Sequence, residues 1–447
     1  MNKLFFILFG LLSGILASQE RATKTLLLPV GSSLQASSLA AYELDSTFVY
    51  RKVDSIVTTG IKNNAFPGAQ VLIAKEGNII FHEAYGFHTY DSIQNVALND
   101  IYDLASVTKI LGPLPAIMKL VDEEKLDLDV PFSTYWKPWR SQKDKATITL
   151  REILTHQAGL EPYIVFLSKT LKNNGRFKKR FIRSKPNNRF SNEAFEGIYV
   201  KNRFNRKMYR IINRSEVSAE KKYKYSGLTF LIFPELITQI TGVPYAEYME
   251  KEFYKPLGMK TFGFLPSTKK FPNKIVPTEV DTIYRHTLTQ GWVHDENASL
   301  LGGISGNAGL FGTADDLAII MQMFMQNGLY AGKQYIAKNT IKEFTKVQYP
   351  DNDNRRGLGF DKPYLKNNTF KIADAYPAPE VGASSFGHSG FTGTFLWADP
   401  EHQMVYIFLS NRVYPTRENR NIYELNIRSS IQQIFYQAFD NVKEHKP

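Results

Sequence analysis

The sequence predicts an α/β fold of the α+β type, in which an antiparallel sheet built from both chain ends is flanked by helices and carries an inserted, mainly helical region. Two strand patterns lie early in the chain, at residues 69–74 and 79–84, on either side of a hairpin turn at 76–78. Two more lie near the C-terminus, at 390–399 and 403–410. The middle is mostly helical or irregular. Strands at both ends and helices between them favour this architecture.

The helices are predicted from apolar residues that recur at helical spacing. The first such pattern lies at 45–61 and the last at 423–439. Between them, helical patterns recur at 149–156, 227–241, 244–253 and 314–326, and a stretch from 101 to 126 is interrupted by Pro113 and Pro115. The 447 residues, 43% of them apolar, can bury one large core or two small ones. We assign residues 45–440 to a single domain.

The N-terminus has the pattern of a signal peptide over residues 1–18. Lys3 supplies a positive charge, residues 4–16 form an apolar run, and Ala17 and Ser18 suit cleavage. A buried N-terminal helix is the alternative. The run is short for a membrane span, and no later stretch is long and apolar enough for one. Residues 19–44 are interpreted as a linker or lead-in. The chain has no cysteine, which excludes disulfides and thiol catalysis and suits a periplasmic or secreted bacterial protein.

The net charge of +12 is concentrated in one segment. Residues 169–224 contain 18 lysines and arginines against four glutamates, together with several aromatic residues. A solvated surface or flexible insertion would explain this composition. The alternative is a cap that presents its cations to an anionic partner, such as an envelope polymer. Nucleic acid is a poor candidate for an exported protein.

A Ser-x-x-Lys tetrad occurs three times, beginning at Ser106, Ser218 and Ser267. Only the first lies between apolar residues and opens a helical stretch. Residues at i and i+3 share a helix face, so Lys109 can reach the Ser106 hydroxyl. A lysine shielded from water loses proton affinity and can act as a base. The alternative is an ordinary helix start with a serine near its N-cap.

Two further motifs follow the tetrad. One is Tyr225-Ser226-Gly227, in which a phenol near a cation can shuttle protons. The other is His388-Ser389-Gly390, in which a cation and a hydroxyl could bind a substrate carboxylate while the glycine allows close backbone approach. We expect this triplet at the start of an edge strand.

These three motifs, in this order, resemble those of the serine β-lactamase and penicillin-binding-protein superfamily, with the class C β-lactamase, DD-peptidase and D-amino-acid amidase or esterase group most similar. The resemblance runs from about residue 45 to about 437 and includes the stretches 66–68, 154–160, 293–298 and 309–317. It implies a β-lactamase/transpeptidase-like fold. It also implies that Ser106 is acylated, that Lys109 assists its deprotonation and that Tyr225 is the acid/base. The backbone N–H groups of Ser106 and Phe391 would form the oxyanion hole.

The same resemblance places His388, Ser389 and Gly390, with Gly227, around the substrate. Two departures from the family pattern bear on specificity. Gly227 stands where an asparagine is usual, so an amide that would hold an acylamide group is missing, and His388 replaces a lysine. The implied function is cleavage of D-amino-acid-containing peptide, amide or ester bonds of peptidoglycan-derived substrates. The alternatives are a β-lactamase and a non-catalytic cell-wall binding or sensing domain.

We expect neither a cofactor nor a metal. His294, Asp295 and Glu296 are adjacent in sequence, and adjacent side chains rarely point at one ion. We interpret this segment as a structural or substrate-lining loop.

Overall fold

The computed structural model describes residues 32–269 and 271–444, so the proposed signal peptide lies outside the described residues. Its main element is a six-stranded sheet with the order β1-β3-β2-β16-β15-β14. The strands are β1 (Gln35–Ala36), β2 (Gly68–Lys75), β3 (Asn78–Gly86), β14 (Phe386–Ser389), β15 (Phe395–Asp399) and β16 (Met404–Ser410). Only β1, which pairs with β3, runs parallel to its neighbour.

The two chain ends meet in the middle of this sheet, as the sequence predicts. β2 and β16 are antiparallel, with Ala69 opposite Ser410 and Lys75 opposite Met404. The prediction of one strand over 390–399 was wrong in detail. The strand there, β15, begins only at Phe395, after a turn at 390–394, and a separate edge strand, β14, precedes the turn. The His388-Ser389-Gly390 triplet therefore lies at the end of edge strand β14 and not at the start of a strand.

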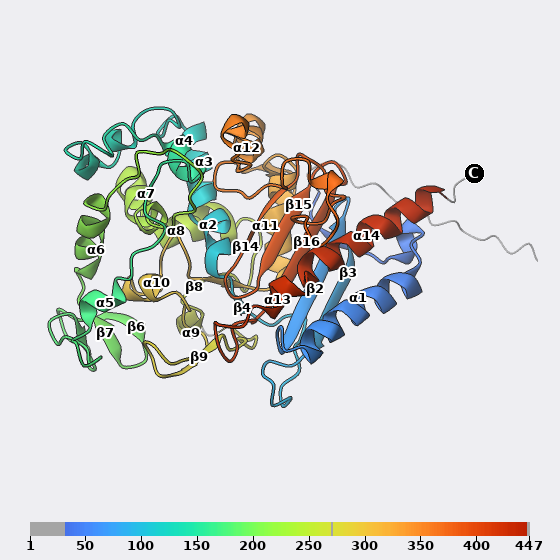
Figure 1. Ribbon diagram of the computed structural model, residues 1–447, viewed down its shortest axis with the longest axis horizontal. Helices are drawn as coiled ribbons and strands as arrows, with labels where there is room; N and C mark the ends of the chain where they lie inside the picture. The colour runs from blue at the N-terminus through green and yellow to red at the C-terminus, as the bar shows by residue number, and fades with distance from the viewer. Residues whose placement is uncertain (1–31, 270, 445–447) are drawn as a thin grey trace, which may run out of the picture.

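Alternating side chains give the sheet two apolar faces. On β16, Val405, Ile407 and Leu409 belong to one core, and Met404, Tyr406 and Phe408 to the other. The second core is covered by α1 (Ser46–Lys62) and α14 (Ile427–Glu444), which lie side by side across the sheet (Figure 1). The first is covered by α11 (Ala314–Met325) and merges with the helical region beyond it.

The helical region between the sheet-forming ends holds the first and second motifs. Its helices are α2 (Thr108–Leu111), α3 (Pro113–Asp122), α4 (Leu150–Leu154), α7 (Phe233–Thr241), α8 (Tyr245–Met249), α9 (Pro266–Lys269), α10 (Glu296–Leu300) and α12 (Lys338–Thr345). Short strands accompany them: β4 (Tyr102–Asp103), β8 (Gly263–Phe264), β9 (Glu279–Asp281), β10 (Thr287–Thr289), β11 (Leu310–Gly312), β12 (Leu329–Tyr330) and β13 (Lys333–Gln334). A short helix, α13 (Asn421–Glu424), precedes α14. No helix of the described residues is long and apolar enough to cross a membrane.

The basic segment, residues 169–224, is ordered into small elements at the edge of the molecule opposite α1 and α14 (Figure 1). They are α5 (Leu167–Thr170), β5 (Ile182–Arg183), β6 (Asn192–Phe195), β7 (Ile198–Val200) and α6 (Phe204–Asn213), and the strands form a sheet in the order β5-β7-β6. Phe190, Phe195 and Phe204 are buried. Burial of these rings explains why the segment folds onto the helical region despite its charge.

Candidate active site

Ser106 lies in a strained turn that links β4 to α2. The turn is a 3₁₀ segment over residues 105–107, and Ala105 has a φ of +44°. A non-glycine residue in this region costs on the order of 1 kcal/mol, which surrounding contacts must offset. One such contact is the Asp103 carboxylate, which accepts the Ala105 N–H at 2.8 Å. Ser106 itself remains partly exposed, in contrast to its buried neighbours.

Lys109 reaches Ser106 across one turn of helix. Its Nζ lies 2.9 Å from Ser106 Oγ and donates to the Asn307 carbonyl at 3.1 Å. The side chain is buried, and Nζ lies 5.3 Å from the centre of the Tyr225 ring. Among the described residues no carboxylate forms an ion pair with Lys109. Its neighbours are instead the Ser106 hydroxyl, the Asn307 carbonyl and the Tyr225 phenol.

Tyr225 completes this group from the segment that follows the basic insertion. Burial raises the pKa of its phenol, but the charge of Lys109, hydrogen bonds with Lys109 and Ser106, and the charge of Arg356 outweigh burial and lower the pKa below its usual value. The buried ring of His156 lies 4.4 Å from the Tyr225 ring, centre to centre. Its Nδ1 accepts the Ser226 N–H at 3.2 Å. His156 thus holds the second motif in place.

His388 faces the same group from β14 and is neutral. Burial, with the nearby charges of Arg356 and Lys109, lowers its pKa to about 3. Nδ1 lies 2.7 Å from the Ser389 carbonyl, so Nδ1 carries the proton and Nε2 is a bare acceptor. Nε2 is buried and has no partner among the described residues. A neutral imidazole with a free lone pair does not supply the cation that the sequence analysis assigned to this position.

Ser389 lines a pocket in which His388 takes no part. This pocket has a volume of about 290 Å³ and is lined by Arg355, Asp361, Tyr364, Ala375, Tyr376, Ser389, Phe395, Ile422, Tyr423, Asn426, Arg428 and Ser429. Asp361 pairs with Arg355 at 2.8 Å. Arg428 is 8% exposed, forms no ion pair with a described carboxylate, and its Nη1 has no partner. We name this the Arg428 pocket. The sequence alone does not indicate that Arg428 lies beside Ser389 in one pocket.

The turn at 390–394 holds Phe391 beside the nucleophile. Thr392 Oγ1 donates to the Asp103 carbonyl at 2.8 Å, and Thr394 Oγ1 donates to the Leu104 carbonyl at 3.2 Å. A Cβ on Gly390 would lie 2.6 Å from the Leu104 oxygen, so only glycine fits there. In the described part of the chain, no hydrogen bond engages the backbone N–H of Ser106 or Phe391. Both remain available to an oxyanion.

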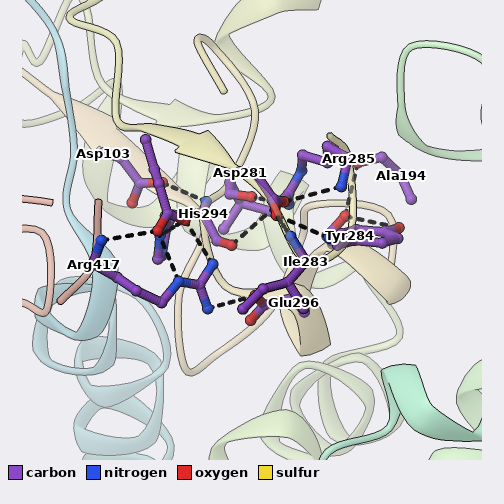
Figure 2. Close-up of polar contacts among 12 residues, drawn as sticks. Asp103, Ala194, Asp281, Ile283, Tyr284, Arg285, His294, Glu296 and Arg417 are labelled. Carbon is purple, nitrogen blue, oxygen red and sulfur yellow. Dashed lines mark hydrogen bonds and ion pairs between the residues drawn. The ribbon is translucent and has the colours of Figure 1, made fainter. Parts of the chain in front are cut away.

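A buried ion network supports this arrangement from the loop at 293–298 (Figure 2). His294 Nε2 lies 2.8 Å from a Glu279 carboxylate oxygen, and Arg417 pairs with the same carboxylate at 2.6 Å. Burial alone would raise the pKa of Glu279, but these two partners lower it to about 2. The His294 N–H donates to the second Asp103 oxygen at 2.7 Å, and its ring stacks on Phe391.

These contacts connect both expected oxyanion-hole residues to one network. Asp103 contacts the nucleophile turn, and His294 contacts Phe391. Within the described residues no group of three or more histidine, aspartate or glutamate side chains is arranged to hold a metal ion. The His294 ring pairs with Glu279, and Glu296 pairs with Arg417. Asp295 accepts hydrogen bonds from the Ala298 N–H and the Asn307 side-chain amide. Sequence reasoning marked the loop, but Asp103, Glu279 and Arg417 carry no motif that would have found them.

The second motif leaves room where an asparagine is usual in the family. A Cβ on Gly227 would meet no atom within 4 Å, and the Gly227 N–H donates to the Pro162 carbonyl at 3.2 Å. The Ser226 hydroxyl donates to the Glu161 carbonyl at 2.6 Å. The motif is therefore fixed by the backbone at 161–162, and the missing side chain leaves open space.

Two buried neutral histidines make stability depend on pH. The pKa of His388 and that of His156 are both lowered, chiefly by burial, so in acid the unfolded chain takes up protons that the folded chain does not. Their contribution to stability is present above pH ~6.5 and is lost as the pH falls towards the folded pKa, at about 1.4 kcal/mol per pH unit for each histidine. We expect urea denaturation to give a free energy of unfolding that falls by about 3 kcal/mol from these groups between pH ~6.5 and ~5, because the unfolded histidines are only half protonated at the upper limit.

The variant His388→Asn measures the contribution of His388 alone. The part of the pH dependence of the unfolding free energy that comes from these two histidines should fall by about half, since only His156 then remains. Other titrating groups contribute equally to both proteins. An unchanged slope in the variant would contradict the neutral assignment of His388.

Comparisons with known proteins agree with this architecture. A family model described as Beta-lactamase matches residues 53–428. The chain is 28% identical over 408 residues to the N-acetylmuramyl-L-alanine amidase of Bacillus subtilis, covering 85% of each chain. It is 30% identical over 386 residues to a putative D-alanyl-D-alanine carboxypeptidase of Salmonella heidelberg, covering 80% of this chain and 81% of the relative.

The fold also matches solved structures. The octameric penicillin-binding protein homologue from Pyrococcus abyssi superposes with a TM-score of 0.60 at 18% identity, covering 87% of this chain and 77% of the other. At that identity the match concerns the fold alone. The family model, which spans most of the chain, settles membership: the chain belongs to the beta-lactamase family of serine hydrolases.

Proposed function

We propose that the protein cleaves its substrate through an acyl-enzyme on Ser106. The observation that carries this proposal is the 2.9 Å contact between Ser106 Oγ and Lys109 Nζ, with Tyr225 interacting with both. The Ser106 oxygen attacks the substrate carbonyl as its proton passes to the Lys109–Tyr225 pair. The oxyanion is held by the N–H groups of Ser106 and Phe391, and it collapses as the bond from the acyl carbon to the leaving group breaks and the proton goes to that group. Water then gives a proton to the same pair and attacks the acyl carbon, the bond to Ser106 Oγ breaks, and Ser106 recovers its proton.

The electrostatics of the site support Tyr225 as the base. A phenol with a lowered pKa is a phenolate for more of the time, and it interacts with both the hydroxyl that loses a proton and the lysine that stabilises the anion. His388, neutral and with a free Nε2, adds an acceptor on the same side without adding charge. It can accept a hydrogen bond from a substrate N–H or from Tyr225.

We infer that the substrates are D-amino-acid-containing peptides, amides or esters derived from peptidoglycan. The relatives named as an amidase and as putative carboxypeptidases support this class. A D-alanyl peptide ends in a carboxylate, and the Arg428 pocket offers an unpaired buried guanidinium next to the Ser389 hydroxyl. We propose that this pocket, and not His388, receives the carboxylate.

Replacing Arg428 with glutamine tests this assignment. We expect kcat/KM to fall about 10- to 100-fold on peptides with a free C-terminal carboxylate, because a charge-assisted hydrogen bond is lost. Hydrolysis of an uncharged ester should change little. The control is Arg420→Gln, since Arg420 also contacts Tyr423 but is exposed and lies outside the pocket. An equal fall in kcat/KM on charged and uncharged substrates would show that the pocket does not recognise the substrate carboxylate.

One experiment tests the proposed activity itself. The purified protein is incubated separately with a D-alanyl-D-alanine peptide, muropeptides, a p-nitrophenyl ester, a fluorescent penicillin and nitrocefin, and labelling and turnover are followed by mass spectrometry. We expect a covalent adduct on Ser106 and turnover of the peptide or ester. Rapid hydrolysis of nitrocefin without turnover of any peptide or ester would favour a β-lactamase instead. No adduct with any reagent would favour a non-catalytic binding domain.

We also propose that the protein acts in the bacterial envelope after removal of residues 1–18. The charged start, apolar run and small residues of this segment support export. Fractionation of cells that express the full chain, with N-terminal sequencing of the recovered protein, tests this location. Recovery of the uncleaved chain from the cytoplasm would contradict it.

A further inference from the structure

The basic segment forms a groove over α6 that holds cations without counter-charges. The groove has a volume of about 830 Å³ and is lined by Phe181, Asn188, Arg189, Lys201, Asn202, Arg203, Phe204, Arg206, Lys207, Arg210 and Ile211. We name it the α6 groove. Six of these side chains are cationic and none is acidic. In the described part of the chain, none of the six takes part in an ion pair.

The scaffold beneath these cations is ordered. The inner face of α6 buries Phe204, Met208 and Ile212. Asn213, at its end, accepts the indole N–H groups of Trp136 and Trp139 at 2.8 Å and 3.0 Å.

Backbone hydrogen bonds hold the opposite wall of the groove. The Lys201 N–H donates to the Phe181 carbonyl at 2.9 Å, and the Asn202 N–H donates to the Arg189 carbonyl at 3.0 Å. The cations therefore project from fixed positions, and a ligand does not have to order the segment in order to bind.

The cations repel one another. Partial burial lowers the pKa of Lys207, and Arg180, Lys178, Lys169 and Arg210 lower it further. Its Nζ lies 4.4 Å from the centre of the Phe181 ring, against which Arg180 also packs. Ordinary surfaces intersperse both signs of charge. A concave site that keeps only one sign gains most from a ligand carrying several negative charges.

A second cavity, of about 430 Å³, adjoins the groove and shares Arg210 and Ile211 with it. Its other lining residues are Glu161, Ile164, Arg214, Ser215 and Glu216. The Glu161 carbonyl accepts the Ser226 hydroxyl of the second motif at 2.6 Å. The second cavity therefore lies between the basic groove and the backbone that supports Tyr225.

We propose that the α6 groove binds a carboxylate-bearing strand of the cell-wall polymer, away from the bond that is cut. The choice of polymer rests on the proposed function, because peptide stems of peptidoglycan carry several carboxylates. The charge and shape of the groove are observations that do not depend on the proposed function. Binding there holds the protein on an insoluble substrate and directs a neighbouring peptide stem to Ser106, while small uncharged substrates bypass the groove.

Co-sedimentation with purified sacculi tests this proposal in a Ser106→Ala background, in which no substrate is consumed. The groove variant adds Arg206→Gln, Lys207→Gln and Arg210→Gln, which keep good helix formers on the outer face of α6. The control adds Arg51→Gln, Lys52→Gln and Lys62→Gln on α1, which remove the same charge from exposed positions at the other side of the molecule. Melting temperatures verify folding.

We expect the groove variant to bind sacculi about tenfold more weakly or worse, and the control to bind within about twofold of the parent. Raising the salt from about 0.05 M to about 0.5 M should weaken binding of the parent much more than that of the groove variant. With Ser106 restored, both triple variants should hydrolyse a p-nitrophenyl ester like the wild type. If the triple variant does not fold, Arg206→Gln and Arg210→Gln made singly should each weaken binding by a few fold.

Three results would overturn the proposal. Unchanged binding by the groove variant means that the groove is solvated surface, and equal weakening in the control means that only net charge matters. Binding lost on sacculi stripped of phosphate-bearing polymers would identify such a polymer as the ligand. Failure of the proposed catalysis is distinguishable from all three, because it would appear as absent acylation by the Ser106 protein while groove-dependent sedimentation persists.

Discussion

Replacing Ser106 with alanine is expected to abolish acylation and turnover together, with a loss of at least about a thousandfold in rate. Lys109 Nζ lies 2.9 Å from this hydroxyl, and without the hydroxyl no covalent intermediate can form. The side chain is small and partly exposed, so the variant should fold as the wild type does. Ester hydrolysis, labelling by a fluorescent penicillin and the melting temperature are the measurements.

The chain supplies matched controls for this substitution. Ser218 and Ser267 open the other two Ser-x-x-Lys tetrads and are both exposed. Ser218→Ala and Ser267→Ala should therefore leave the rate unchanged. Activity retained in Ser106→Ala, at a normal melting temperature, would refute the assignment of the nucleophile.

Removing Lys109 or Tyr225 should each reduce the rate about 100-fold or more, and the two losses should not multiply. Lys109→Met keeps the length of the buried side chain and removes its charge, and Tyr225→Phe removes only the hydroxyl. Lys109 lowers the pKa of Tyr225, so loss of the lysine also leaves less of the phenol ionised at a given pH. The two groups thus act as one proton-transfer unit.

A double-mutant cycle measures this coupling. We expect the double variant to be nearly as active as the slower single variant on the same ester. A double variant whose loss equals the product of the two single losses would show that the groups act independently. The pH profile gives a second readout: in Lys109→Met, the alkaline rise in kcat/KM should move to higher pH, because the phenol then has a higher pKa.

The sequence predicts the features that depend only on residues close together in the chain. Short runs of apolar residues next to turns predicted β2, β3 and β16, and helical spacing predicted α1, α11 and α14. The Ser106–Lys109 contact follows from an i, i+3 relation on a helix, so the printed sequence contains it. β14 could not be separated from β15, because a short edge strand with glycine on both sides of its histidine and serine has too little pattern.

The features that could not be predicted depend on residues far apart in the chain. Arg356 lowers the pKa of His388 only because the fold brings the two together, and a histidine in sequence gives no indication that it is neutral. Adjacent residues of a strand point to opposite faces, so the sequence predicts that Ser389 and His388 lie on different sides of β14. It does not predict that Arg428 from α14 lines the pocket beside Ser389. Asp103 and Glu279 act through tertiary contacts alone.

The pairing of β2 with β16 also has a consequence for how the enzyme is made. These neighbours in the sheet lie roughly 330 residues apart in the chain, which raises the contact order and slows folding. A nascent chain that has produced Ser106, Lys109 and Tyr225 still lacks Phe391 and the strand that positions it. Hydrolytic activity can therefore arise only after the C-terminal strands have been synthesised and have closed the sheet, so a growing chain is inert until its last hundred residues or so are in place.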